Sequence, residues 1–213
     1  MKDTSEPSPD EIPIKIMVIG NTAVGKTSFI LKYTEDTFQE VHLSTVGVDF
    51  RIKHITYNNK KYKLSIYDTT GQERYKALAF SLIKNVDGII LIYDVTDIST
   101  FKSVPDWIQS AREKKGENYP MIILGNKIDL KEKRQIKEEE GKNFAENKRM
   151  AFFEISVKTG ENLDNLTLFI IKKIFNLPDD FSGEIIVRKK NINEKKKDEE
   201  ICVEKFCCFY SCL

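Results

Sequence analysis

Cysteine is missing from almost the whole chain. All four cysteines among the 213 residues fall in the last twelve positions, as Cys202, Cys207, Cys208 and Cys212. A disulfide framework would spread its cysteines through the fold, so this distribution argues against one and predicts a reducing compartment. The clustering also indicates that the tail has a chemistry of its own.

Long hydrophobic runs and an excess of one charge are missing too. No segment approaches the roughly 20 apolar residues that a membrane-spanning helix needs. Residues 1–11 are polar and include Pro7 and Pro9, so we expect a disordered extension there and no signal peptide. With 34 basic and 33 acidic residues the net charge is +1, which gives no electrostatic case for a nucleic acid partner.

A phosphate-binding pattern is present near the start of the chain. Residues 20–27, GNTAVGKT, follow an apolar run, precede a helical one and have the spacing G-x-x-x-x-G-K-T. Gly20 and Gly25 permit backbone angles that turn successive N–H groups inward to form an anion site at a helix N-terminus. Lys26 adds a cation for the β and γ phosphates, and the Thr27 hydroxyl can bind a bridging Mg²⁺. An ordinary glycine-containing β–α turn is the alternative.

A second pattern, N-K-x-D at residues 126–129, follows the apolar run 121–124 and selects the base. The Asp129 carboxylate can accept hydrogen bonds from N1–H and the 2-amino group of guanine, whereas adenine has no donor at either place. Sites of this kind reject the analogue without the donor by about 10⁴ or more. We expect Asn126 and Lys127 to brace the loop and Phe38 to cover the base. A plain surface turn is the alternative.

Two further segments provide groups that sense the terminal phosphate. Asp68 ends an alternating strand and can hold Mg²⁺ through water, while the Gly71 N–H can approach the γ-phosphate. Gln72 can orient the attacking water, and Thr45 can bind both the metal and the phosphate. Because these contacts exist only while the γ-phosphate is present, hydrolysis releases both segments.

The sequence therefore predicts one site for GTP or GDP and Mg²⁺. Gln72 and Lys26 are the catalytic candidates, and Thr27, Thr45 and Asp68 are the metal ligands. A turn at residues 156–158 can offer backbone N–H groups to the guanine oxygen. The predicted nucleotide-binding residues are Gly20, Thr22, Ala23, Val24, Gly25, Lys26, Thr27, Ser28, Phe38, Thr45, Gly71, Asn126, Lys127, Asp129, Ser156, Val157 and Lys158.

Together these motifs resemble the Rab branch of the Ras-like small GTPases over about residues 12–178. The branch is indicated by STVGVDF at 44–50, YDTTGQERY at 67–75, LIYDVT at 91–96 and the paired cysteines. The resemblance implies a GTP-hydrolysing switch of vesicle traffic. It also implies an exchange factor, a GTPase-activating protein, a GDP-dissociation inhibitor and effectors as partners. It places a monomer on the cytoplasmic face of an intracellular or plasma membrane, cycling with the cytosol.

The order of periodic segments predicts an α/β fold with a doubly wound, mostly parallel sheet and one antiparallel hairpin strand, the P-loop NTPase fold. The hairpin strands are expected at 46–57 and 61–68. Later helices are expected at 105–115, 135–147 and 162–176, with Trp107 in the packed interior. Residues 12–178 form a single G domain in this prediction.

Residues 179–213 are predicted to be a hypervariable, disordered, lipid-modified tail. Residues 184–213 carry seven basic and six acidic side chains, a weak attraction for a membrane. The resemblance implies geranylgeranylation of Cys207, Cys208 or both, which would anchor the chain reversibly. Unmodified thiols are the alternative. Cys212 fits neither common prenylation pattern, which leaves open which thiols carry lipid.

Some residues depart from the family pattern. Thr70 stands where the family usually has alanine and Thr22 where it often has glycine or serine, so the hydrolysis rate cannot be carried over. Tyr67 and Leu82 replace aromatic residues that, in the family, link the two phosphate-sensing segments to effector proteins. The identity of the effectors is therefore open. A GTP-binding scaffold with little hydrolysis is therefore an alternative to an active GTPase, whereas Asp129 and Gln72 disfavour a P-loop kinase or ATPase.

Overall fold

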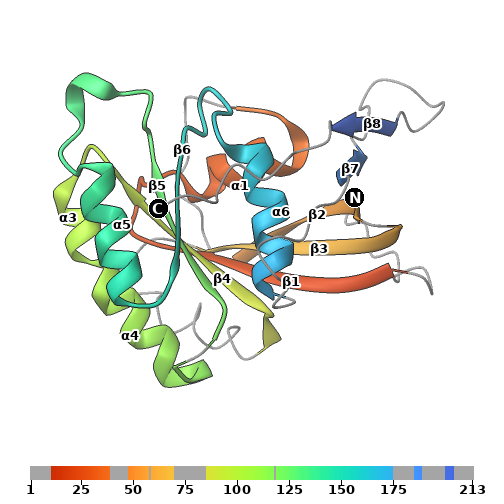
Figure 1. Ribbon diagram of the computed structural model, residues 1–213, viewed down its shortest axis with the longest axis horizontal. Coiled ribbons are helices and arrows are strands. Elements are labelled where there is room, and N and C mark those ends of the chain that lie inside the picture. The colour runs from red at the N-terminus through yellow and green to blue at the C-terminus, as the bar shows by residue number, and fades with distance from the viewer. Residues whose placement is uncertain are drawn as a thin grey trace, which may run out of the picture.

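One mixed sheet runs through the part of the chain that the computed structural model describes, which is residues 11–38, 48–57, 59–69, 85–117, 119–174, 185–188 and 200–203. Its eight strands have the order β6-β5-β4-β1-β3-β2-β7-β8 (Figure 1). The strands are β1 (Glu11–Ile19), β2 (Val48–Tyr57), β3 (Lys60–Thr69), β4 (Gly88–Asp94), β5 (Met121–Asn126), β6 (Ala151–Ile155), β7 (Ile185–Arg188) and β8 (Glu200–Val203).

Five of the strands are parallel, and this decides where a site can form. β1 pairs in parallel with β3 and β4, and β4, β5 and β6 continue the parallel ladder. β2 pairs antiparallel with β3 along its length, so the predicted mostly parallel sheet with one hairpin strand is confirmed. Since parallel strands share their carboxyl ends, the loops that follow β1, β3, β4, β5 and β6 meet at one edge.

Helices cover both faces of the sheet (Figure 1). α1 and α6 pack on one face, and α4 and α5 pack on the other. Pro105 lies in the first turn of α4, where its missing N–H costs no helical hydrogen bond. The helices are α1 (Lys26–Glu35), α3 (Ile98–Lys102), α4 (Val104–Lys115), α5 (Glu138–Asn147) and α6 (Leu163–Ile174), with a short 3₁₀ turn η3 (Lys131–Lys133).

The core follows the alternation of β1. Ile14, Ile16 and Val18 belong to the cluster under α1 and α6, whereas Met17 and Ile19 belong to the cluster under α4 and α5. Successive side chains of a strand point to opposite faces, so one apolar strand supplies both layers. Each such aliphatic side chain, once buried, stabilises the fold by roughly 1.5–3 kcal/mol.

Strand pairing occurs near both ends of the chain at residues that the sequence predicts to be disordered. Glu11, assigned to the disordered extension, is the first residue of β1, opposite Lys61, and its carboxylate lies 3.0 Å from His54 Nδ1. In the predicted disordered tail, residues 185–188 and 200–203 form β7 and β8. β7 adds to the free edge of β2, because an extended segment there can use the unpaired backbone groups.

Among the described residues, no helix combines the length and the apolarity that crossing a membrane would require.

Candidate nucleotide site

The loop between β1 and α1 has a backbone that few residue types allow. Gly20 and Gly25 have φ of 138° and 98°, and Ala23 has a positive φ of 63°. A Cβ on Gly20 would lie 2.2 Å from the Ile92 carbonyl oxygen, so glycine is required there for space as well as for angle. Gly25 is the N-cap of α1, so the positive end of the helix dipole lies at this loop.

Lys26 opens α1 with a buried ammonium group. Its Nζ donates to the backbone carbonyl of Asn21 at 2.7 Å. Burial lowers the pKa of Lys26 to about 8, and the nearby Asp68 carboxylate opposes that shift. The side chain is therefore held inside the loop, as a partner for an anion would need to be.

Thr27 and Asp68, the two predicted metal ligands that the structure describes, lie together. The Thr27 Oγ1 donates to Asp68 Oδ2 at 2.7 Å. Burial raises the pKa of Asp68, and the Thr27 hydrogen bond and the Lys26 charge lower it. Asp68 Oδ1 is buried and has no hydrogen-bond partner among the described residues. A hydroxyl and an orphaned carboxylate oxygen are the hard oxygen donors that Mg²⁺ prefers, so these residues fit that ion.

The loop after β5 is bonded to the phosphate loop. Asn126 is 2% exposed, and its Nδ2 donates to the Val24 carbonyl at 2.9 Å. The Lys127 Nζ donates to the Ala23 carbonyl at 2.9 Å and pairs with Asp94 Oδ2 at 2.5 Å. Two loops that are about 100 residues apart in sequence are therefore locked together at the carboxyl edge of the sheet.

The third loop of the site follows β6. Ser156 Oγ donates to Asp129 Oδ1 at 2.7 Å, which fixes the carboxylate predicted to read guanine. The Val157 N–H donates to Asn126 Oδ1 at 3.1 Å, and the Ser156 N–H donates to the Glu161 carbonyl. These two N–H groups thus serve the protein itself, which differs from the expectation that they face the guanine oxygen. Lys158 is exposed.

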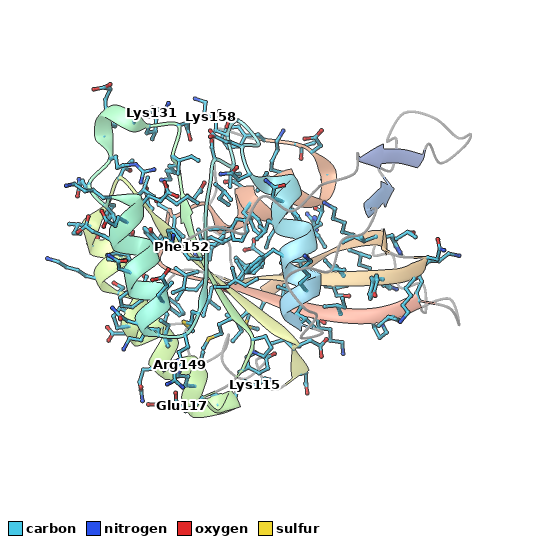
Figure 2. The ribbon with its side chains drawn as sticks, viewed as in Figure 1. Lys115, Glu117, Lys131, Arg149, Phe152 and Lys158 are labelled. Carbon is cyan, nitrogen blue, oxygen red and sulfur yellow. The ribbon has the colours of Figure 1, made fainter. Side chains whose placement is uncertain are left out.

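Figure 2 shows the end of the molecule at which these loops lie. Lys158, after β6, and Lys131, after β5, are at one end, while Lys115, Glu117 and Arg149, which precede those strands, are at the other. The loops that follow β1, β5 and β6 come after the carboxyl ends of parallel strands, which places them at the first end.

Several predicted residues stand apart from these contacts. Phe38 is half-buried against the cluster under α1. Thr22, in the phosphate loop, is exposed, and Ser28 is buried at the start of α1. Predictions for Thr45, Gly71, Gln72, Cys207 and Cys208 lie outside the described residues, as does the departure at Thr70.

Sequence reasoning missed three side chains at the site. Asp94 pairs with Lys127, and the Trp107 Nε1 donates to Asn21 Oδ1 at 2.7 Å. In the sequence Asn21 is one of the variable positions of the G-x-x-x-x-G-K-T spacing, and Trp107 is predicted to lie in the packed interior. Asp94 closes a parallel strand at the site edge, which is a signal that could have been used, but nothing in the sequence pairs Trp107 with Asn21.

Comparison with known proteins agrees with this geometry. The model of the Ras family matches residues 15–176. The chain is 37% identical to Ras-related protein Rab-13 of Rattus norvegicus over 150 residues, 70% of this chain and 74% of the relative. It is 39% identical to Ras-related protein Rab-3C of Bos taurus over 162 residues, 76% and 71% of the two chains. EF-hand calcium-binding domain-containing protein 4B of Homo sapiens is 36% identical over 171 residues, 80% of this chain but 23% of that protein.

Proposed function

Because the chain belongs to the Ras family and is a Rab-like small GTPase acting in vesicle traffic, we propose which of its residues bind guanine nucleotide and hydrolyse GTP. The observation that carries the proposal is the bonding of Asn126 and Lys127 to the phosphate loop. These bonds join a loop suited to a base to a loop suited to phosphates.

The phosphate loop binds the charged end of the nucleotide. Backbone N–H groups of residues 20–28 surround the phosphates. The Lys26 ammonium group has three donors, so it binds phosphate oxygen while one donor stays on the Asn21 carbonyl. Thr27, Asp68 and Thr45 would hold Mg²⁺, and the ion would supply positive charge to the phosphates. Asp129 selects guanine, and Phe38, Lys127 and the turn at 156–158 enclose the base.

Hydrolysis is an in-line attack of water on the γ-phosphate. Gln72 orients that water, and Lys26 stabilises the charge that develops on the phosphoryl oxygens. We expect unaided turnover to be slow, and an arginine from a GTPase-activating protein would accelerate it by about 10³ to 10⁵.

The tail attaches this switch to a membrane. We propose lipid on Cys207, Cys208 or both, since one prenyl chain gives reversible binding and two give stable anchoring. The monomeric chain then acts on the cytoplasmic face of an intracellular or plasma membrane. An exchange factor, effectors and a GDP-dissociation inhibitor would recognise its nucleotide state.

A glutamine comparison tests the catalytic assignment. Gln72→Leu removes the group that orients water but no predicted nucleotide contact, so GTP binding should stay nearly intact while single-turnover hydrolysis falls about tenfold or more. Gln109→Leu is the matched control, because Gln109 is an exposed residue of α4 bonded to Glu113 and should leave both quantities unchanged.

Two outcomes would count against the proposal. Equal hydrolysis by Gln72→Leu and the wild type would remove Gln72 from the chemistry. A wild type that binds GTP but does not turn it over, even with cell extract as a source of activating protein, would indicate the GTP-binding scaffold.

A further inference from the structure

The side chain of Asn21 connects the phosphate loop to the junction of α3 and α4. The Trp107 indole Nε1 donates to Asn21 Oδ1 at 2.7 Å, and Asn21 Nδ2 donates to Ser103 Oγ at 3.1 Å. Indole is only a donor, so it fixes which end of the amide faces α4. Ser103 Oγ donates in turn to the Ser99 carbonyl at 3.0 Å, which leaves its lone pair for Asn21.

Asn21 also provides a hydrogen-bond acceptor for Lys26. The Asn21 backbone carbonyl accepts from Lys26 Nζ at 2.7 Å. Asn21 thus contacts α4 with its side chain and the Lys26 ammonium group with its main chain.

The phosphate loop is neither helix nor strand, so it depends on hydrogen bonds from other segments to hold its conformation. Its backbone has positive φ at Gly20, Ala23 and Gly25, and such positions are rarely adopted by residues with a Cβ. Asn126 and Lys127 hold its second half. Asn21 is the described side chain that ties its first half to a helix, and it does so 86 residues away in sequence.

We propose that Trp107, Ser103 and Asn21 form a positioning network that holds the first half of the phosphate loop closed around bound nucleotide. This inference rests on the proposed function and deepens it. Release of GDP requires the loop to open, and opening breaks the bonds from Asn21 to α4. α4 thereby sets the lifetime of the bound nucleotide without touching it.

Packing and hydrogen bonding by Trp107 can be separated. Trp107 is 3% exposed and lies in the cluster under α4 and α5, so a large aromatic ring is needed there for volume. Phenylalanine keeps most of that volume but cannot donate. Trp107→Phe therefore removes the bond to Asn21. Asn21→Leu removes that bond from the opposite side together with the bond to Ser103, with little change in side-chain size.

The test measures release of a fluorescent GDP analogue from the full chain, chased with excess GDP. Trp107→Phe should release it about three- to tenfold faster, the factor expected for one lost hydrogen bond, and Asn21→Leu, which also loses the bond to Ser103, should release it at least as fast. The double variant should be no faster than Asn21→Leu within about twofold, because Asn21→Leu already lacks the bond that Trp107→Phe removes. Ile108→Val is the control, since Ile108 packs in the same cluster and should lower the melting temperature without changing release.

Four results would overturn the inference. Additive acceleration in the double variant would mean that the two residues act separately. Acceleration by Ile108→Val equal to that of Trp107→Phe at the same loss of melting temperature would reduce the effect to general destabilisation. Unchanged release by Trp107→Phe from a chain whose wild type retains GDP would overturn the network alone, whereas a wild type that fails to retain GDP would overturn the proposed function as well.

Discussion

Lys26 is the residue whose environment depends most directly on bound phosphate. Burial lowers its pKa to about 8, and the Asp68 carboxylate recovers only part of that shift. A lysine of this kind is partly neutral just above neutral pH while the site is empty. Phosphate oxygens would favour its charged form, so nucleotide binding should raise the pKa and take up a proton.

This linkage predicts a pH dependence of GDP affinity. GDP affinity should be highest well below pH 8, where Lys26 is charged in the empty site. It should fall as pH rises through the pKa of Lys26 in the empty site, which is about 8, and be about tenfold weaker at pH 9. Direct titration with GDP from about pH 6.5 to about pH 9 measures it. Lys26→Arg is the matched control, because a guanidinium group stays charged over this pH range. The GDP affinity of this variant, though weaker, should change only as the nucleotide itself titrates. Parallel curves for the two proteins would refute the linkage.

At the scale of elements, the edge of β2 is covered by the tail. β7 pairs antiparallel with β2 at three positions, Ile55 with Val187, Thr56 with Ile186 and Tyr57 with Ile185, and β8 pairs with β7. Such a short hairpin is marginal alone and takes its order from the sheet. It covers the edge of β2 over residues 55–57.

Truncation after residue 178 should therefore expose β2 locally. Backbone amides at 55–57 that donate to β7 should exchange hydrogen at least about tenfold faster, because their partners are gone and local opening becomes easier. Amides of β3 that pair with β2 provide the internal control and should keep their protection. Unchanged exchange across 55–57 would show that β7 does not pair there in solution.

At the scale of the whole molecule, the site joins both faces of the sheet. α1 belongs to one layer and α4 to the other, and both contact the loop that begins at Gly20. Loss of the γ-phosphate would release the contacts predicted for Thr45, Gly71 and Gln72 while the parallel strands remain packed. A change at one phosphate then alters surface segments without unfolding the domain.

The nucleotide state should accordingly be visible in hydrogen exchange. Segments that include Thr45 and Gln72 should be better protected with a non-cleavable GTP analogue than with GDP, since the terminal phosphate supplies partners that GDP lacks. The buried residues Leu166 and Ile170 of α6 lie in a segment that should not respond. Equal protection of the segments near Thr45 and Gln72 in the two states would contradict the switch.

The sequence by itself determined the sheet and predicted where the site lies. An apolar strand before GNTAVGKT and another before NKID could be placed because hydrophobic period and glycine spacing are local properties. The parallel sheet, the hairpin at β2 and β3, and the family were predicted and confirmed. Roles assigned to Gln72, Thr45 and the tail cysteines stay predictions.

Only the tertiary structure decided which side chains hold the site together. Trp107 and Asn21 are 86 positions apart, and Lys127 and Ala23 are 104 apart. Neither pair leaves a periodic signal. The β7 pairing likewise depends on an edge that β2 offers only once the sheet exists. Local patterns specify strands and turns because their causes lie within a few residues, whereas contacts between loops depend on where the packed sheet brings their ends.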